Sequence, residues 1–272
     1  MSRRKRLLYL VVCGPVVAYL VFVLVAFLGQ REALYPVRWI APGPEQAPEH
    51  RDTELWTMQR EFGQIEAYWM PASGTEPRGL VVYLHGNGYT IDVIPPSLEA
   101  YRRLGYHVLI PEYRGYGRTA GSPTEEGLRD DVVAWIDRAT TQPEVDAGRL
   151  VLHGYSLSSK MSKTVARVRT PRAMILESTF RSVPQLGWER GLPGFLARDV
   201  YDTQGWLRGW GGPVMLSHGR ADRVVPFSHG VALSELRDGI EFEAHDGGHV
   251  PSRGQAYWSR TREFLGRVMS KK

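Results

Sequence analysis

Cysteine is almost absent from the sequence: Cys13 is the only one, and it lies within a long apolar run. The rest of the chain therefore contains no disulfide and no thiol that could act in catalysis or bind a metal. Asparagine is equally scarce, since Asn87 is the only one in 272 residues. Lysine is rare as well, with five residues against 29 arginines, which is typical of a GC-rich genome. An asparagine that persists in such a composition is a candidate functional residue.

The chain also lacks a surplus of positive charge outside its ends. The formal net charge is +5, but the basic residues 3–6 and the final pair, Lys271 and Lys272, together supply +6. The remaining residues are close to neutral. We therefore expect no nucleic-acid partner, because binding to phosphate requires clustered lysine and arginine.

Charged side chains are missing from Leu7 through Gly29, a run of 23 residues. A helix of that length crosses a hydrocarbon core of about 30 Å. A cleaved signal peptide has a shorter apolar region and a small-residue cleavage site, so an uncleaved signal anchor is the better interpretation. The basic residues 3–6 precede the run, whereas Arg31 and Arg38 follow it with Glu32 between them. The positive-inside rule predicts a cytoplasmic N-terminus and places the rest of the chain across the membrane, in the periplasm or at the outer face of a bacterium.

The most informative motif is Gly154-Tyr-Ser-Leu-Ser158, which follows the apolar residues Leu150 to Leu152. A buried strand that turns sharply into a helix, with a serine at the apex, exposes the hydroxyl of Ser156 as a nucleophile. The backbone N–H of Leu157 would point to the same place and stabilise an oxyanion. Ser158 stands where such motifs have glycine, and Lys160 lies one helical turn beyond Ser156. We therefore expect local strain at Ser158 and a surface or cleft-rim charge at Lys160.

Three other loops follow predicted strands. His85-Gly-Asn-Gly88 would supply a second oxyanion N–H from Asn87, although a simple glycine turn is the alternative. Asp222 would fix the tautomer of a histidine, although an Asx turn or a helix N-cap is the alternative. His249 would be the general base for Ser156, and His245 is its less favoured competitor because it lies at a strand end. His245 and His249 could also hold a metal, but no third ligand matches, so we expect no metal and no cofactor.

The chain order serine, acid, histidine is that of α/β-hydrolases. At this point the sequence resembles the α/β-hydrolase superfamily, and is most similar to its membrane-anchored ABHD proteins and their bacterial counterparts. The shared phrases run from about residue 60 to the C-terminus: His85-Gly-Asn-Gly88, Tyr113-Arg-Gly-Tyr-Gly-Arg118, Gly121-Ser-Pro-Thr-Glu-Glu-Gly127, Glu177-Ser178 with Phe180, and His218-Gly219 with Asp222 and Val225-Pro226. The resemblance implies Ser156 as nucleophile, Asp222 as acid, His249 as base, Asn87 and Leu157 as oxyanion donors, and esterase, lipase or thioesterase chemistry.

The remaining pattern predicts an α/β fold with a mostly parallel central sheet and helices on both faces. We expect an anchor over 1–30, a linker and lead-in over 31–58, and the hydrolase domain over 59–272. The expected strands are 65–69, 80–84, 107–110, 150–152, 174–176, 214–216 and 241–244, all of them nearly continuous apolar runs. Ser122 is the expected N-cap of a helix, with Pro123 in its first turn and Glu125 completing a capping box. Residues 181–212, rich in tryptophan and leucine, predict a small helical cap, either packed on the sheet edge or roofing an acyl-binding cleft.

The sequence thus predicts a membrane-anchored serine hydrolase that cleaves carboxylic ester or thioester bonds of a small molecule or lipid. A catalytically inactive scaffold of the same fold is one alternative, favoured by Ser158 and Lys160, and a peptidase of the same fold is another. The sequence leaves the acyl chain length, the head group and the oligomeric state open.

Overall fold

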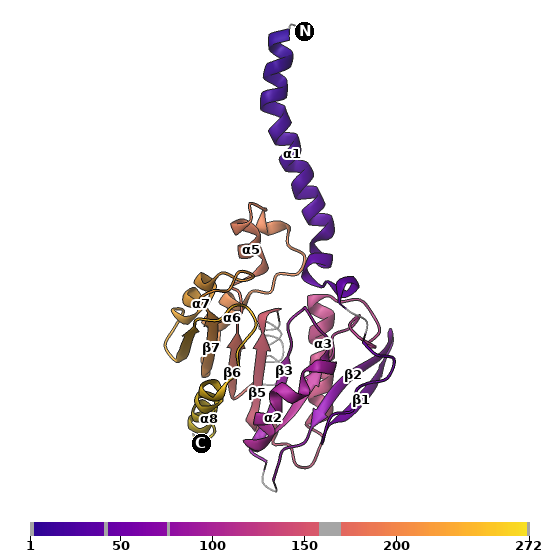
Figure 1. The fold of residues 1–272 in the computed structure, drawn as a ribbon, viewed down its shortest axis with the longest axis vertical. Helices are drawn as coiled ribbons and strands as arrows, with labels where there is room; N and C mark the ends of the chain where they lie inside the picture. The colour runs from indigo at the N-terminus through magenta and orange to yellow at the C-terminus, as the bar shows by residue number, and fades with distance from the viewer. Residues whose placement is uncertain (1–2, 41–42, 75–76, 158–169, 271–272) are drawn as a thin grey trace.

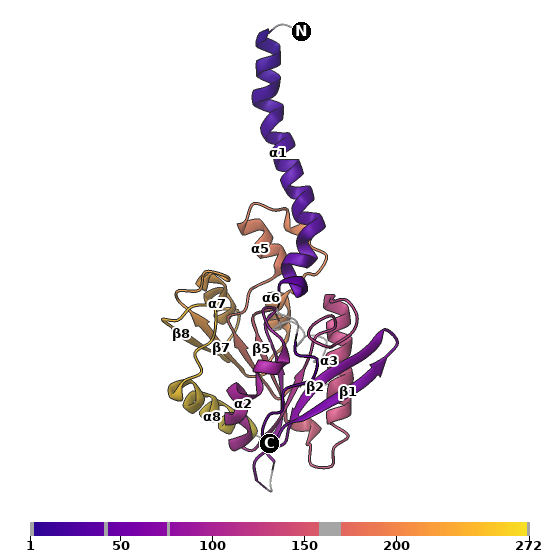
Figure 2. The ribbon, with the colours of Figure 1, turned by 45° about the vertical axis from the view of Figure 1, so that its right-hand side comes forward.

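The computed structural model describes residues 3–40, 43–74, 77–157 and 170–270 (Figure 1). Ser158 and Lys160, for which strain and a surface charge were expected, lie outside these ranges. The described residues form one long N-terminal helix that projects from an α/β domain (Figures 1 and 2).

A single eight-stranded sheet, in the order β1-β2-β4-β3-β5-β6-β7-β8, forms the centre of the domain. The pairs from β4 to β8 are parallel, whereas β1 with β2 and β2 with β4 are antiparallel. The expected mostly parallel sheet is confirmed, and each of the seven predicted strand ranges lies within an observed strand. The bounds are β1 Glu54–Arg60, β2 Gly63–Met70, β3 Gly79–Leu84, β4 Tyr106–Pro111, β5 Leu150–Tyr155, β6 Ala173–Glu177, β7 Val214–Gly219 and β8 Ile240–His245.

Strand β1 is the one that the sequence pattern did not predict. It begins at Glu54, inside the segment 31–58 for which a linker and lead-in were expected. It forms the edge of the sheet, and Trp56 is its only buried residue. Only alternate residues of β1 are covered by the domain, so its sequence contains no continuous apolar run and gives a weak signal.

Helices cover both faces of the sheet. The bounds are α1 Arg3–Leu34, α2 Pro95–Arg103, α3 Glu125–Ala139, α5 Val183–Glu189, α6 Thr203–Gly209, α7 Phe227–Ser234 and α8 Gln255–Ser270, with short 3-10 helices at Val37–Trp39, Ile91–Val93, Ala147–Arg149 and Gly194–Leu196. Side chains of α3, α6 and α7 pack with Leu80, Val82 and Leu84 of β3, while α2 and α8 pack with Val81 and Tyr83. Successive residues of one strand thus point into the two cores on opposite faces of the sheet, which explains the continuous apolar runs.

The start of α3 differs from the expectation. Thr124, not Ser122, is the N-cap, and its hydroxyl accepts a hydrogen bond from the N–H of Gly127 at 3.0 Å. Glu125 does not complete a capping box either, because its carboxylate accepts hydrogen bonds from the N–H groups of Val200 and Tyr201 instead. Glu125 therefore bonds to the cap region 181–212, a tertiary contact that a local capping rule cannot predict.

Among the described residues, α1 is the one helix long and apolar enough to cross a membrane, from Val11 to Leu34. The cap region 181–212 contains α5, the 3-10 helix Gly194–Leu196 and α6. Trp206 and Leu207 of α6 are buried in the domain core, so that part packs as an ordinary layer. In contrast, α5 and Gly194–Leu196 stand beside α1, outside the sheet layers (Figures 1 and 2).

Candidate active site

Ser156 follows directly on β5 and adopts an unusual backbone conformation. Its φ is 56°, in the left-handed region that non-glycine residues rarely occupy. The residue is buried, and the hydroxyl of Thr179 donates to its carbonyl at 3.4 Å. A strained residue at the end of a buried strand is the geometry that presents a side chain at the edge of a sheet.

The side chains of Ser156, His249 and Asp222 form one hydrogen-bonded chain. His249 Nε2 lies 3.0 Å from Ser156 Oγ, and His249 Nδ1 lies 2.8 Å from Asp222 Oδ2. Asp222 follows β7 and His249 follows β8, two neighbouring parallel strands. The carboxyl ends of parallel strands lie at the same edge, so residues distant in sequence meet there.

The Asp222 carboxylate is held as an anion. Its side chain is fully buried, and burial by itself would raise its pKa. Hydrogen bonds from His218, from His249 and from the N–H of Val225 outweigh burial and hold the pKa of Asp222 well below its usual range. The N–H groups of Val224 and Val225 contact Oδ1 at 2.8 and 2.9 Å, which leaves Oδ2 for the histidines.

His218 is a site residue to which the sequence analysis assigned no role. It is completely buried, its Nε2 lies 3.3 Å from Asp222 Oδ2, and the same atom contacts the carbonyl of Val225 at 3.0 Å. It therefore fixes the loop that carries the acid. A histidine at the end of an apolar strand, four residues before that acid, was the available signal.

A close approach of backbones joins the acid loop to the histidine loop. A Cβ on Gly219 would lie 2.2 Å from the carbonyl oxygen of Gly247, so only glycine fits there. The N–H of Ala221 donates to the same carbonyl at 3.1 Å, and the N–H of Arg220 donates to the carbonyl of His245 at 2.7 Å. His245 itself accepts the N–H of Gly247 at 3.1 Å, so its ring organises the turn.

The two proposed oxyanion donors lie on adjacent segments. Leu157 follows Ser156, and its side chain is buried in the core. The loop with Asn87 packs against the same turn, because a Cβ on Gly86 would lie 2.7 Å from the Tyr155 ring. The side-chain amide of Asn87 donates to the carbonyl of Leu34 at 2.8 Å, which ties this loop to the end of α1.

Two further histidines near the site, His85 and His153, have structural partners. His85 stacks on Tyr113 with ring centroids 3.9 Å apart and contacts Glu112 at 3.0 Å. His153 contacts Glu177 at 2.8 Å and the hydroxyl of Tyr101 at 2.9 Å. Within the described ranges, no group of three or more His, Cys, Asp or Glu side chains is arranged to hold a metal ion.

No protein-family model matches the chain. Among curated proteins, YfhR of Escherichia coli K12 is 29% identical over 178 residues, which cover 62% of each chain. The lysophosphatidylserine lipase ABHD12 of Danio rerio is 29% identical over 205 residues, 66% of this chain and 52% of the relative. Human ABHD12B is 26% identical over 195 residues, 62% of this chain and 52% of the relative. The chain thus matches between half and two thirds of the length of these relatives.

Solved structures share the fold at lower identity. The esterase Pf2001 of Pyrococcus furiosus superposes with a TM-score of 0.67 at 18% identity, covering 84% of this chain and 98% of that one. An α/β hydrolase from Vibrio vulnificus gives a TM-score of 0.62 at 18% identity and covers 81% of both chains. Similarity at this identity establishes the shared architecture, whereas function depends on the residues of the site.

Proposed function

We propose that the chain is a membrane-anchored serine hydrolase of the α/β-hydrolase superfamily that cleaves carboxylic ester or thioester bonds. The observation that carries the proposal is the continuous hydrogen-bonded chain from Ser156 through His249 to Asp222. The ionised state of Asp222 suits it to stabilise an imidazolium at His249.

In the proposed reaction, His249 Nε2 takes the proton of Ser156 as Oγ attacks the substrate carbonyl. The N–H groups of Asn87 and Leu157 stabilise the negative charge that develops on the carbonyl oxygen. The protonated imidazole then gives its proton to the leaving alcohol or thiol, which departs and leaves an acyl-enzyme. Water, deprotonated by His249, attacks the acyl-enzyme, releases the carboxylic acid and restores the hydroxyl of Ser156.

The proposed location and substrate class rest on α1. Its length and composition suit a single membrane span, and the basic residues 3–6 favour a cytoplasmic N-terminus, so the domain would lie on the opposite side. An enzyme held at a bilayer meets lipid esters at high local concentration. The Danio rerio relative is a lysophosphatidylserine lipase, which also supports a lipid-derived substrate.

Covalent labelling of the full chain with a fluorophosphonate, together with turnover of esters of graded chain length, tests the proposal. We expect Ser156→Ala to abolish both, and Asp222→Asn to lower kcat by about 10⁴-fold because the imidazole loses its anionic partner. Ser178→Ala is the matched control, since Ser178 is buried, follows the neighbouring strand β6 and also has a positive φ of 47°.

Three outcomes would contradict the proposal. Equal labelling of wild type and Ser156→Ala would show that Ser156 is not the nucleophile. A folded wild type without labelling or ester turnover would favour the inactive scaffold. Cleavage of peptides in preference to esters would favour the peptidase alternative.

A further inference from the structure

The cap contacts α1 along one face of the helix. Tyr19, Val23, Ala26, Phe27 and Gln30 recur at helical spacing on that face. The hydroxyl of Tyr19 donates to the carbonyl of Gly191 at 3.1 Å, and the amide of Gln30 donates to the carbonyl of Leu196 at 3.3 Å. The same amide accepts the N–H of Arg198 at 2.7 Å. The α1 helix is thus docked on the cap as well as linked to it through the chain.

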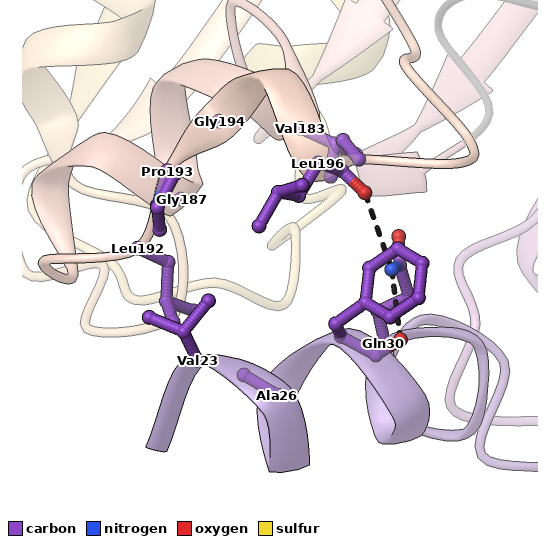
Figure 3. A pocket seen from close by; sticks show the side chains of 11 residues that line it. Val23, Ala26, Gln30, Val183, Gly187, Leu192, Pro193, Gly194 and Leu196 are labelled. Carbon is purple, nitrogen blue, oxygen red and sulfur yellow. Dashed lines mark hydrogen bonds between the residues drawn. The ribbon is translucent and has the colours of Figure 1, made fainter. Parts of the chain in front are cut away.

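An apolar pocket of about 90 Å³ lies between the two elements (Figure 3). Val23, Ala26 and Phe27 form its wall on α1, and Val183, Leu192 and Pro193 face them from the cap. Among the described residues that line it, none has a charged side chain and only Gln30 has a polar one, which is already hydrogen-bonded to the cap. The pocket is smaller than a whole-ligand site of about 300–1,000 Å³ and suits a segment of a hydrocarbon chain.

The position of these contacts along α1 sets the depth of the cap. The residues that touch the cap, from Tyr19 to Gln30, lie within the segment Val11–Leu34 that is long enough to cross a membrane. Tyr19 lies about 22 Å along the axis from Leu34, at 1.5 Å per residue. If α1 crosses a bilayer, the cap residues 187–196 therefore lie beside its membrane-spanning part and outside the aqueous phase.

The polar groups of residues 187–196, which we call the cap tip, fit an apolar surrounding. Lipid offers no hydrogen-bond partners, so the backbone groups must find theirs within the protein. The N–H groups of Gly191 and Leu192 donate to carbonyls of α5, at 3.1 and 2.9 Å. The carbonyls of Gly191 and Leu196 are the ones that accept from Tyr19 and Gln30 of α1.

The two charged residues of the cap tip, Glu189 and Arg190, are exposed but bonded to the domain. Glu189 contacts His229 of α7 at 2.8 Å, and Arg190 donates to the carbonyl of Val224 at 3.1 Å. Phe195 and Trp188 are in contact with each other and exposed, at 77% and 55%. Exposed aromatic side chains beside a span are typical of protein at the membrane surface.

We propose that the cap tip is immersed in the bilayer leaflet crossed by the C-terminal half of α1, and that an acyl chain of a bilayer lipid occupies the α1–cap pocket. The inference rests on the membrane anchoring included in the proposed function, but not on catalysis. A lipid chain is the occupant because the pocket is apolar, opens beside the span and is flanked by exposed aromatic rings.

Bromine quenching of Trp188 tests the proposal, because its indole nitrogen approaches Gly194 in the pocket wall. The full chain is reconstituted into phosphatidylcholine vesicles with or without dibrominated acyl chains. Trp39→Phe is the common background, since Trp39 is another exposed tryptophan, just beyond α1. The component of emission that Trp188→Phe removes is expected to fall by about half or more in brominated vesicles, as for a group buried among acyl chains.

Two phenylalanine substitutions on α1 separate the pocket from the general immersion. Ala26→Phe fills the pocket and is expected to relieve part of the quenching. Val25→Phe adds a ring on the exposed side of the same turn and is expected to leave the quenching as in wild type.

Vesicle flotation and ester turnover are measured on the same samples. A chain that floats while Trp188 stays unquenched would overturn the immersion. Equal quenching in Ala26→Phe and wild type would overturn occupancy of the pocket, and protection that grows with protein density would assign the pocket to a second copy. Failure to float would refute the membrane anchoring itself, whether or not the ester is cleaved.

Discussion

Beneath the proposed triad, Glu177 is the centre of a buried charged cluster. Its carboxylate contacts His153 at 2.8 Å, and Arg253 contacts it at 3.2 Å through Nε. Arg253 also donates to the hydroxyl of Tyr83 at 2.7 Å, and it lies four residues beyond His249. The cluster therefore ties the end of the histidine loop to the end of β6, which makes Arg253 a positioning residue for His249.

Loss of Arg253 should strongly destabilise the fold. Arg253→Met leaves the carboxylate of Glu177 buried without its cation, and such a change costs about 3–5 kcal/mol. Urea unfolding of the full chain in a mild detergent measures the difference. Arg267→Met is the matched control, because Arg267 pairs with Glu241 at the exposed surface and is worth less than about 1 kcal/mol. If both substitutions lowered the free energy of unfolding equally, the buried cluster would contribute no more to stability than a surface ion pair.

The same cluster predicts acid sensitivity. Burial alone would raise the pKa of Glu177, but Arg253 and His153 outweigh it and hold that pKa well below its ordinary value of 4.5. As the pH falls below about 4.5, Glu177 becomes protonated in the unfolded chain but stays ionised in the folded protein. The free energy of unfolding therefore decreases. One such proton changes it by about 1.4 kcal/mol per pH unit.

Glu177→Gln should therefore flatten the acid limb of the stability curve. Between about pH 3 and about pH 4.5, the free energy of unfolding of wild type should change more steeply than that of the variant. Near neutral pH the two slopes should coincide, because Glu177 is ionised in both the folded and the unfolded state. If the free energies of unfolding of wild type and variant changed in parallel over the acid range, the pKa of Glu177 would be the same in the folded and the unfolded chain.

At the scale of elements, the junctions between α1, the cap and α3 are built from polar side chains. Arg31 of α1 contacts the buried Asp199 at 3.0 Å, and Asp199 also accepts the N–H of Glu125 at 2.8 Å. The hydroxyls of Tyr35 and Tyr201 lie 2.7 Å apart beside them. These contacts join the C-terminal end of α1 to the cap and to the first turn of α3, so the three elements form one unit.

The N-cap of α3 can be tested by a pair of neighbouring substitutions. Thr124→Ala removes the hydroxyl that accepts from Gly127 and should lower the free energy of unfolding by about 1 kcal/mol. Ser122→Ala, at the exposed position that the sequence pattern favoured, should change it by less than about 0.5 kcal/mol. Thermal unfolding of both variants measures the two effects. A larger loss of stability in Ser122→Ala would indicate that Ser122, not Thr124, is the N-cap of α3.

At the scale of the whole molecule, the arrangement has a long apolar helix at one end and the sheet domain at the other (Figure 2). The proposed triad lies at the edge formed by the carboxyl ends of the strands, and the adjacent loop with Asn87 is bonded to the end of α1. The candidate site is thus on the α1 side of the domain, which supports the proposal of a hydrolase that takes its substrate from a membrane.

The orientation in the membrane is testable with single cysteines. Cys13→Ser gives a cysteine-free chain, because Cys13 is the only one. In that background, a membrane-impermeant maleimide should label Ser270→Cys in cells with a permeable outer layer and an intact inner membrane, and Ser2→Cys only after lysis. Replacing the basic residues 3–6 with glutamine should weaken this asymmetry. The reverse labelling pattern would place the domain in the cytoplasm.

The sequence by itself determined the features that depend on local composition. The buried strands appear as apolar runs because both of their faces are covered, and α1 appears as an apolar segment of the length that a membrane span requires. The turn at Ser156 and the loops with Asp222 and His249 follow strands whose ends could be located, so those residues could be named in advance. The geometry then places their side chains within hydrogen-bonding distance of one another.

Only the tertiary structure decided the contacts between distant segments. Nothing near Arg253 in the sequence reveals that it contacts Glu177, because the two residues are 76 positions apart and lie on different segments. Glu125 contacts the cap instead of completing a capping box, and β1 pairs with β2 at the edge of the sheet. The docking of α1 on the cap is of the same kind, since it joins residues 172 positions apart through side chains whose local pattern is simply that of an apolar helix.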